Sequence, residues 1–301
     1  MKFPTKRALK RGIKLIVSLG FFIATFIWNF VRRMGGKKEP GTCVVLYYHS
    51  VAPQYRAQFA RQMDMLRRCA TPIRADRKSA LDRGVHYAVI TFDDGIQSIV
   101  ENALPELKKR DIPSTFFIVT EALERQPTWL TEPAACNSEE KVISVDQLRK
   151  LPSDLVTIGS HSITHRRLTY LEEREAKREL AESRTKLEKM LNEEVRLFSF
   201  PYGDFNKRLV VWCRESGYHR VFTISPTLAF SNPQEFVTGR IEIEATDWPM
   251  EFRLKVLGAY RWLPLAFALK QKILSSSLLN RILRGRGRSR ETTRLYAAPR
   301  E

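Results

Sequence analysis

Cysteine and histidine are both scarce in this 301-residue sequence, which has four of the first and five of the second. The cysteines lie far apart, and none belongs to a CxxC pair or to a Cys/His zinc spacing. A disulfide framework is typical of small secreted domains, so we interpret the cysteines as separate buried thiols. They are Cys43, Cys69, Cys136 and Cys213.

Acidic residues are scarce at both ends of the chain, and the formal net charge is +18. Residues 1–40 contain ten Lys/Arg and one acid, and residues 251–301 contain twelve Lys/Arg and three acids. The centre, residues 41–250, has 29 charges of each sign and is neutral. A neutral centre without a recognition motif argues against a nucleic-acid partner. Basic flanks beside apolar segments suit an anionic membrane surface instead.

One apolar run of 17 residues without a charge extends from Leu15 to Val31. As a helix it would be about 26 Å long, just enough to span a bilayer with help from its flanks. No small-residue cleavage site follows it, which favours an uncleaved anchor over a signal peptide. Six Lys/Arg precede the run and four follow within ten residues. This pattern predicts contact with membrane lipids and a single-pass protein of the cell membrane, with its globular domain on the extracytoplasmic side.

Short apolar runs alternate with helical patterns in the centre of the chain. Amphipathic spacing predicts helices near residues 100–110, at 146–149 and over 171–193, the last with a charged face that we interpret as solvated. Seven strands alternating with helices predict a parallel α/β sheet, either open or closed as a barrel. The predicted strands are Cys43–Tyr48, Tyr87–Phe92, Thr115–Val119, Leu155–Gly159, Leu197–Phe200, Arg220–Ile224 and Val237–Ile243.

The pattern changes after Pro249. Residues 251–283 mix Leu, Ala, Phe and Trp with Lys and Arg, which fits a packed helix pair and an interfacial amphipathic helix equally well. The Arg/Gly-rich residues 284–301 are predicted to be a disordered tail. The chain therefore divides into a basic N-terminus, anchor and linker over residues 1–41, a central domain over 42–250, a helical extension and a tail.

Two motifs in the neutral centre carry side chains suited to metal-assisted hydrolysis. Asp93, Asp94 and Gly95 follow one predicted strand, and His161 and His165 follow another. Ligands collect at the carboxyl ends of parallel strands, so these side chains can meet there. One carboxylate and two imidazoles offer a divalent metal three ligands and an open position for water, with the second carboxylate as a base beside it.

Each motif alone also has an ordinary structural interpretation. Acids after a strand are common in turns and helix caps, and two histidines four residues apart fit a surface pair. A third motif, Pro201-Tyr202-Gly203, follows another predicted strand and is by itself a turn signal. A backbone N–H in such a turn can nevertheless point into a site and stabilise an oxyanion.

In this order, Thr91–Gly95, His161–His165 and Pro201–Gly203 resemble the first three motifs of polysaccharide deacetylases, the NodB-homology group or carbohydrate esterase family 4. The resemblance covers about residues 43–260. It implies an α/β fold, a deformed (β/α) barrel of about seven parallel strands, and hydrolysis of N-acetyl groups on amino sugars. Further similar segments are residues 45–50, 101–107, 112–118 and 239–243.

The resemblance also implies a role for each motif residue. Asp93 would be the general base, and the Tyr202 backbone N–H, next to Pro201, would help to hold the oxyanion. Zinc suits the implied ligand set best, and nickel or cobalt would also fit. The implied metal ligands are Asp94, His161 and His165.

The sequence departs from the family pattern at two positions. The family's third motif carries an arginine two residues before the proline, where this chain has Ser199. Arg240 is a candidate replacement for orienting the base, with a purely structural ion pair as the equal alternative. The family's late histidine, which supplies the general acid, is missing, because no histidine follows His219. His49 is the candidate substitute, since related members that begin with a Tyr-His strand are circularly permuted; a structural histidine at a strand–loop junction is the alternative.

The resulting hypothesis is a membrane-anchored, metal-dependent deacetylase of an N-acetylated glycan, either a polysaccharide or a lipid-linked glycan. One alternative is a non-catalytic glycan-binding module on the same fold, because a fold does not determine function. Another is a deformylase of a lipid-linked amino sugar.

Overall fold

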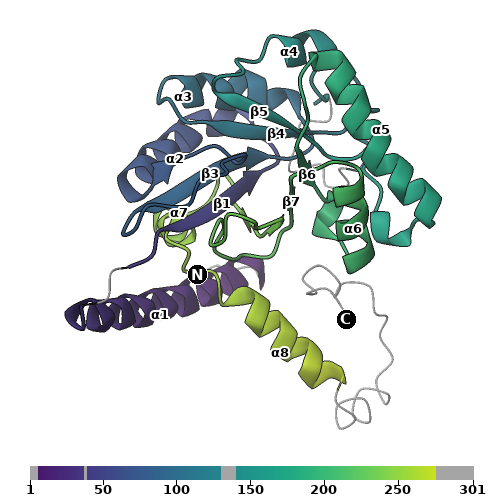
Figure 1. Ribbon diagram of the computed structural model, residues 1–301. Helices are drawn as coiled ribbons and strands as arrows, with labels where there is room; N and C mark the ends of the chain where they lie inside the picture. Colours follow the sequence, from purple (N-terminus) through teal and green to yellow (C-terminus); the bar gives the residue numbers. More distant parts are fainter. Residues whose placement is uncertain (1–5, 37–38, 130–139, 276–301) are drawn as a thin grey trace.

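The computed structural model describes residues 6–36, 39–129 and 140–275. These residues form a curved parallel sheet with helices packed around it, and two helices lie outside this body (Figure 1). The strands are β1 (Thr42–Tyr48), β2 (Thr71–Pro72), β3 (His86–Phe92), β4 (Ser114–Ile118), β5 (Val156–Ser160), β6 (Leu197–Ser199), β7 (Arg220–Phe222), β8 (Val237–Thr238) and β9 (Ile241–Glu242). The α-helices are α1 (Lys6–Met34), α2 (Arg56–Cys69), α3 (Leu104–Lys108), α4 (Val145–Arg149), α5 (Glu173–Leu191), α6 (Lys207–Glu215), α7 (Pro249–Val256) and α8 (Leu263–Ser275).

The sheet confirms the predicted α/β class and deformed barrel. Neighbouring strands pair in parallel in the order β8-β7-β6-β5-β4-β3-β1-β9, and β2 pairs with β3. The two end strands, β8 and β9, belong to one short segment, residues 237–242. This segment therefore bridges the open side of the half-barrel.

The prediction of one continuous strand over Val237–Ile243 is wrong. Gly239 and Arg240 separate β8 from β9. A Cβ at Gly239 would lie 2.0 Å from the Ser225 carbonyl oxygen, so the chain approaches this neighbour more closely than any other residue type allows. The strand β2 was not predicted, because two residues are too short for a recognisable pattern.

Alternating side chains of β1 fill two separate cores. Val44, Leu46 and Tyr48 join the large cluster between the sheet and the helices, whereas Cys43 and Val45 join a smaller cluster inside the barrel. Successive strand residues point to opposite faces, so a continuous apolar run is what a strand buried on both faces requires. This explains why the strand predictions in the centre of the chain succeed.

The predicted helices are also present. Ser144 caps α4 through a capping box with Gln147, and α5 extends over most of the predicted residues 171–193. In the basic C-terminal region, α7 packs on the domain through buried apolar residues, whereas α8 leaves the body of the domain and exposes Leu265 and Leu269. The predicted tail and residues 276–283 lie outside the described residues.

The predicted free thiols are present in the described part of the chain. Cys43 and Cys213 are buried, and Cys69 is half-buried; all three are free. Burial raises the pKa of both buried thiols far above its ordinary value, which makes them unreactive. Cys136 lies outside the described residues.

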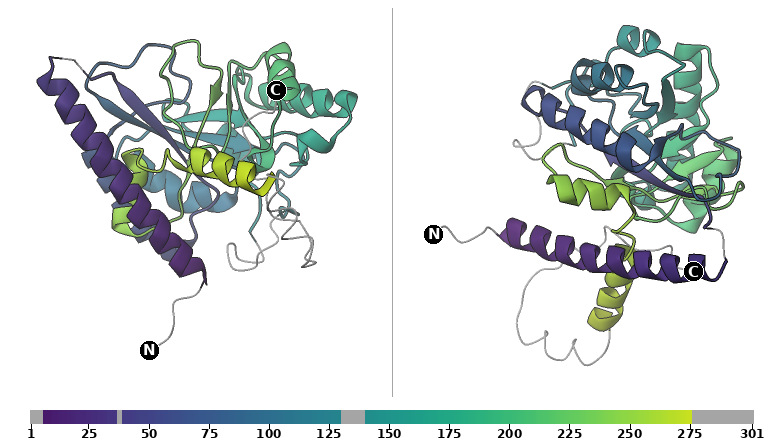
Figure 2. Two further views of the ribbon diagram at one scale, coloured as in Figure 1. Left: turned by 90° about the horizontal axis from the view of Figure 1, so that it is seen from below. Right: turned by 90° about the vertical axis from the view of Figure 1, so that its left-hand side faces the viewer.

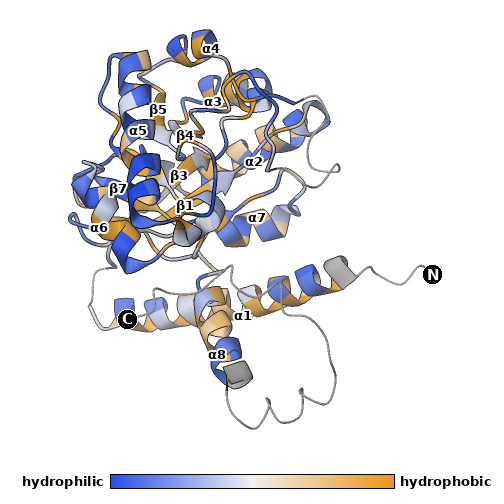
Figure 3. Cartoon of the chain, turned by 90° about the vertical axis from the view of Figure 1, so that its right-hand side faces the viewer, coloured by the Kyte–Doolittle hydropathy of each residue, from blue (hydrophilic) through white to orange (hydrophobic). Residues whose placement is uncertain are grey.

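The apolar run predicted as an anchor lies in α1. Among the described residues, this is the one helix that is long and apolar enough to cross a membrane, a criterion that a signal sequence near an N-terminus also meets. The helix extends along one side of the domain (Figure 2), and Figure 3 shows α1 and α8 outside the body with hydrophobic residues on both.

The two-sided core generates a stability prediction. Leu46 is fully buried in β1, which pairs with a strand on each side, so Leu46→Ala should lower the free energy of unfolding by about 2–5 kcal/mol. Val211→Ala on the exposed side of α6 is the matched control, because Val211 is 50% exposed, and it should change this value by less than about 0.5 kcal/mol. Urea titration of both variants measures the difference, and similar midpoints would contradict the assigned core.

Candidate active site

The predicted catalytic residues gather at the carboxyl edge of the sheet. Register pairs the last residue of β1 with Phe92 of β3, and the last residue of β4 with Ser160 of β5. Asp93, Asp94 and His161 follow these strand ends directly. The parallel sheet therefore brings together motifs that are more than sixty residues apart in the chain.

Three side chains form a candidate metal centre. The Asp94 Oδ1 atom lies 3.2 Å from the Nε2 atom of His165 and 3.5 Å from that of His161. All three side chains are buried, and one ligand atom from each lies within 4.8 Å of the others. Tetrahedral coordination with bonds of ~2.0–2.2 Å puts neighbouring ligand atoms roughly 3.4 Å apart, which these two separations match.

Hydrogen bonding shows which nitrogen of His161 faces the centre as an acceptor. Its Nδ1 atom lies 2.8 Å from the Ser199 carbonyl oxygen. A carbonyl oxygen can only accept, so Nδ1 carries the proton and Nε2 presents its lone pair to Asp94. Burial lowers the pKa of His161 to about 4, which keeps the imidazole neutral, as metal ligation requires.

The charge distribution fits a cation at this point. Asp94 Oδ1 is buried without a hydrogen-bond partner among the described residues, and the lone pair of His161 points at the same space. Burial acts to raise the pKa of Asp94, but the neighbouring His165 imidazole outweighs it, so the pKa lies well below its ordinary value. Buried acceptors facing one another are costly unless a positive charge lies between them.

The second carboxylate, Asp93, is held by a buried arginine. Arg240 donates from Nη1 to Asp93 Oδ1 at 2.8 Å and from Nη2 to Oδ2 at 2.7 Å. Both side chains are buried. Burial acts to raise the pKa of Asp93, but the Arg240 guanidinium and His161 outweigh it, so the pKa is lowered and the group is ionised. The paired N–H groups fix both carboxylate oxygens in one orientation.

Ser199, which stands at the position of the family's arginine, belongs to the same cluster. Its hydroxyl accepts a 2.7 Å hydrogen bond from Arg240 Nη2 and lies 3.4 Å from Asp93 Oδ2. Thr91 contributes another acceptor, since its hydroxyl lies 3.0 Å from Arg240 Nη1. Sequence reasoning identified Arg240 but assigned no role to these hydroxyls, because Ser and Thr in strands carry no signal of their own.

Tyr202 lies beside the candidate metal centre. Its ring centroid is 4.7 Å from that of His165, and the Arg167 guanidinium lies 4.2 Å above the tyrosine ring. Pro201, which is buried, begins the 3₁₀ turn Pro201–Gly203. Within this turn Tyr202 has φ 58° and ψ 8°, a left-handed backbone that is uncommon for a bulky residue.

Left-handed backbone occurs at several positions around the site. Asp94, Ser162 and His165 also have positive φ angles, of 69°, 68° and 58°. Each such residue costs about 1 kcal/mol or more and persists only where its surroundings enforce it. The concentration of this strain around the ligand set is typical of a functional site.

His49 lies at the rim of the site, not within its buried part. It follows β1, its side chain is 45% exposed, and its Nδ1 atom is 4.0 Å from Glu242 Oε1. The imidazole is close enough that its charge contributes to lowering the pKa of both Asp93 and Asp94. The structure therefore places this residue beside the cluster on the solvent side.

Sequence reasoning missed a buried glutamate that holds the histidine loop. Glu179 of α5 is fully buried; its Oε2 accepts from the backbone N–H groups of Ile163 and Thr164 at 2.8 and 3.0 Å. The interpretation of the α5 charges as a solvated face is wrong at this position. The sequence could have indicated this burial, because Glu179 lies in the apolar stripe of α5, between Ala176 and Leu180.

An open cavity of about 460 Å³ lies next to the candidate metal centre. Trp129, which sequence reasoning also missed, stacks on His165 with ring centroids 4.4 Å apart. Tyr170 and Tyr202 line the same cavity, together with Arg166. Aromatic walls with a few polar groups are typical of ligand pockets.

Comparison with known proteins finds similarity to polysaccharide deacetylases. Residues 81–221 match the family model described as polysaccharide deacetylase. The Bacillus subtilis (strain 168) protein YxkH, named as a candidate polysaccharide deacetylase, is 23% identical over 217 residues, which are 68% of this chain and 73% of that protein.

Solved structures show the same fold. IcaB from Ammonifex degensii superposes with a TM-score of 0.59 at 24% identity, over 74% of this chain and 98% of that one. The Streptococcus pyogenes deacetylase PplD, in complex with acetate, superposes with a TM-score of 0.59 at 18% identity, over 72% and 99% of the two chains. The fold predicted from the motif resemblance is therefore confirmed.

The Glu179 contacts generate a prediction. Glu179→Ala leaves two loop amides without their acceptor, which should lower the free energy of unfolding by about 2–4 kcal/mol and the affinity for added zinc by roughly 10- to 100-fold. Glu182→Ala, on the exposed face of the same helix, is the control and should change neither value. Isothermal titration with zinc and urea unfolding measure both effects, and unchanged zinc affinity would show that Glu179 does not position the loop.

Proposed function

We propose that this chain is a polysaccharide deacetylase, a metal-dependent hydrolase that removes N-acetyl groups from amino sugars of a polysaccharide or lipid-linked glycan. The observation that carries the proposal is the buried set of Asp94, His161 and His165 beside the ionised Asp93. A decayed binding module would have no reason to keep two buried imidazoles, a buried carboxylate and a separately held base in one place.

The metal would be held by Asp94, His161 and His165. When bound, a divalent cation supplies Lewis acidity toward the amide carbonyl and toward water. Zinc fits two imidazoles and a carboxylate best, and nickel or cobalt also fits. The neutral state of His161 and the unpaired Asp94 Oδ1 support this assignment.

The remaining residues supply proton transfer and orientation. Asp93, kept ionised and in one orientation by Arg240, accepts the proton of the attacking water. The Tyr202 backbone N–H, in its strained turn beside His165, stabilises the oxyanion of the tetrahedral intermediate. His49, at the solvent-side rim, donates a proton to the departing amine, so that the products are acetate and a free amino sugar.

The protein is held at a membrane through its N-terminal helix. The length and apolar surface of α1 support attachment, and the basic flanks favour a cell membrane with anionic lipids. The distribution of Lys/Arg on the two sides of the run is the sequence argument for a single pass with the domain on the extracytoplasmic side; the contacts of α1 described below support a different geometry of attachment. Such a location would give the site access to exported or lipid-linked glycans.

Metal removal and restoration test the catalytic proposal. The full chain in detergent should release acetate from N-acetylglucosamine oligomers, lose this activity after chelation, and regain it with added zinc. Asp94→Ala, His161→Ala and His165→Ala should each lower acetate release at least 10³-fold and abolish stoichiometric zinc binding. The control His219→Ala removes an exposed histidine that lies 3.9 Å from Glu194 and should leave both unchanged. Turnover that persists in all three ligand variants would contradict the proposal.

The outcome without acetate release is also informative. Bound metal without release would point to another acyl group, such as formyl, or to a lipid-linked substrate, and a formate assay separates these two. Neither metal nor release would favour a glycan-binding module.

The Arg240 contacts generate a separate prediction. Arg240→Lys keeps a positive charge but loses the two parallel N–H groups that hold Asp93, so kcat should fall about 10- to 100-fold while zinc stoichiometry stays unchanged. Zinc content and kcat, measured on the same preparation, test this. An unchanged kcat would mean that the Arg240–Asp93 pair is only structural.

A further inference from the structure

The helix α1 is fastened to the catalytic domain by polar contacts. Arg11 donates from Nε to Glu251 Oε2 at 2.5 Å and from Nη2 to the Thr246 carbonyl oxygen at 2.8 Å. The Arg11 guanidinium also lies 4.6 Å from the ring centroid of Trp248. The N-terminal part of α1 therefore contacts the loop that precedes α7 and the first turn of α7.

A second contact lies further along α1. Ser18 is fully buried, and its hydroxyl accepts a 2.9 Å hydrogen bond from Trp262 Nε1. Leu15 and Phe22 pack against the main core of the domain on the same face of the helix. Arg11, Leu15, Ser18 and Phe22 follow the 3–4 residue spacing of one helix face, so this face is a docking face.

Charge balance on the domain depends on this docking. Asp247 and Glu251 are nearly buried, with side chains 3% and 7% exposed, and one domain cation, Lys255, lies 2.6 and 3.6 Å from them. Arg11 supplies the second positive charge, at 2.5 Å from Glu251 and 3.5 Å from Asp247. Burial raises the pKa of Asp247 to about 6 even with both cations present. Without α1 two clustered acids would share one lysine.

The opposite face of α1 is wide, apolar and exposed. Ile16, Ile23, Ile27 and Trp28 have between 49% and 72% of their surface exposed. A helix on the surface of a water-soluble domain shows the reverse arrangement, with its apolar stripe inward. The further exposed apolar residues are Leu9, Ile13, Val17, Leu19, Phe26, Phe30, Val31 and Met34.

We propose that α1 lies along the surface of an anionic bilayer, with its Arg11–Ser18–Phe22 face on the catalytic domain and its Ile16–Ile23–Ile27 face in lipid. This inference rests on the proposed membrane attachment and changes its geometry. The domain is then held against the membrane in one orientation, with the N-terminus and the domain on the same side of the bilayer. The lipid-facing surface continues onto α8, which begins beside Ser18 at Trp262 and exposes Leu265 and Leu269.

A crossing helix is incompatible with these contacts. From Arg11 to Met34 the helix is roughly 35 Å long at ~1.5 Å per residue, more than the ~30 Å hydrocarbon core. A single pass would carry Arg11 across the bilayer, away from Asp247 and Glu251, and would also expose Ser18 to lipid. The docked helix retains all of these contacts and still buries its apolar face.

Charge identifies lipid as the occupant of this face. Lys10, Lys14, Arg32 and Arg33 are exposed at the two ends of the apolar face, and Lys270 is exposed on α8. Basic residues at the borders of an apolar helix face are the arrangement that binds anionic bilayers. A second copy of this chain would bring the same positive charges together.

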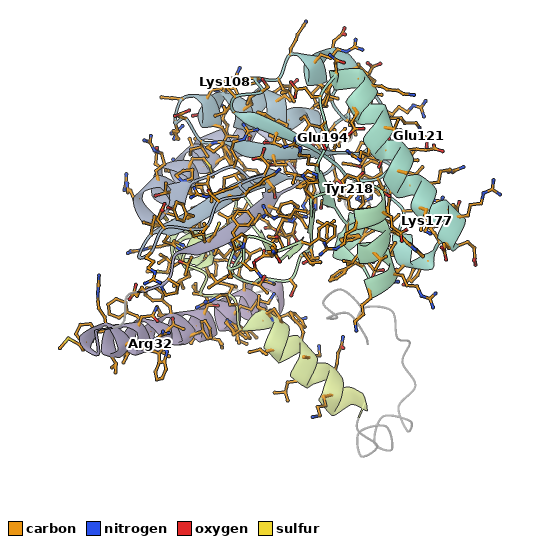
Figure 4. The ribbon with its side chains drawn as sticks, viewed as in Figure 1. Arg32, Lys108, Glu121, Lys177, Glu194 and Tyr218 are labelled. Atoms are coloured by element: carbon orange, nitrogen blue, oxygen red, sulfur yellow. The ribbon has the colours of Figure 1, made fainter. Side chains whose placement is uncertain are left out.

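Sidedness labelling tests the inference in the membrane. The full chain, with Cys69 and Cys136 changed to Ser, carries either Lys10→Cys at the start of α1 or Lys108→Cys on α3, on the far side of the domain from α1 (Figure 4). A membrane-impermeant maleimide is applied separately to sealed right-side-out vesicles and to sealed inside-out vesicles. We expect both positions to react from the same side, and reaction from opposite sides would overturn the docked arrangement in favour of a single pass.

Vesicle flotation distinguishes failure of the docked arrangement from failure of membrane attachment itself. The full chain should float with vesicles that contain phosphatidylglycerol and much less with vesicles of phosphatidylcholine alone. A chain that stays unbound and dimeric would overturn both attachment and the docked arrangement, while acetate release would still report on the catalytic proposal independently.

Charge reversal tests the fastening itself. In nanodiscs with anionic lipid, Arg11→Glu should lower the unfolding midpoint of the domain by roughly 5 °C or more, because it places a third acid in the Asp247–Glu251 cluster. Arg32→Glu, at the other end of α1 (Figure 4), is the matched control and should change the midpoint by less than about 1 °C. Equal midpoints for the two variants would show that Arg11 does not contact the domain in the membrane.

Discussion

The ion pair between Arg240 and Asp93 is the interaction on which the centre of this molecule depends. A guanidinium that is fully buried inside a barrel is costly unless a carboxylate and other acceptors meet it, and here Asp93, Thr91 and Ser199 all do so. The pair also fixes the segment that joins the two ends of the sheet, because Arg240 lies between the end strands β8 and β9 while Asp93 directly follows the interior strand β3. The same contact therefore closes the half-barrel and orients the proposed base.

This arrangement moves the positive partner of the base to a different strand. In the family pattern an arginine precedes the proline of the third motif, whereas Ser199 stands there in this chain and bonds to Arg240. A serine at that position leaves room for a guanidinium that enters from the far end of the chain. A forked donor holds both oxygens of a carboxylate in one orientation, and the structure supplies one to Asp93 from another element.

The histidine loop and the apolar helix α1 are each stabilised by buried charge on the domain. Glu179 receives the strained histidine loop, and the Asp247–Glu251 cluster receives Arg11 of α1. In both cases the buried acid meets its donors only when the two segments are packed together. This requirement gives each contact a defined geometry. The first contact positions the proposed metal ligands, and the second sets how the site would face a glycan if the proposed membrane attachment holds.

Local pattern in the sequence determined the strands, the long helix α5, the capped α4, the apolar α1 and the chemical identity of the ligand set. These features depend on periodicity and on residue type at fixed spacing, which neighbouring residues carry. The break between β8 and β9, the contacts of Thr91 and Ser199 with Arg240, the burial of Glu179 and the stacking of Trp129 on His165 were decided only by tertiary structure. They join residues that are far apart in the chain, and no local pattern records which distant partner compensates a buried charge. Docking of α1 is likewise decided by tertiary structure, because the sequence shows its apolar run, whereas the face that meets the domain depends on where Asp247 and Glu251 lie in the fold.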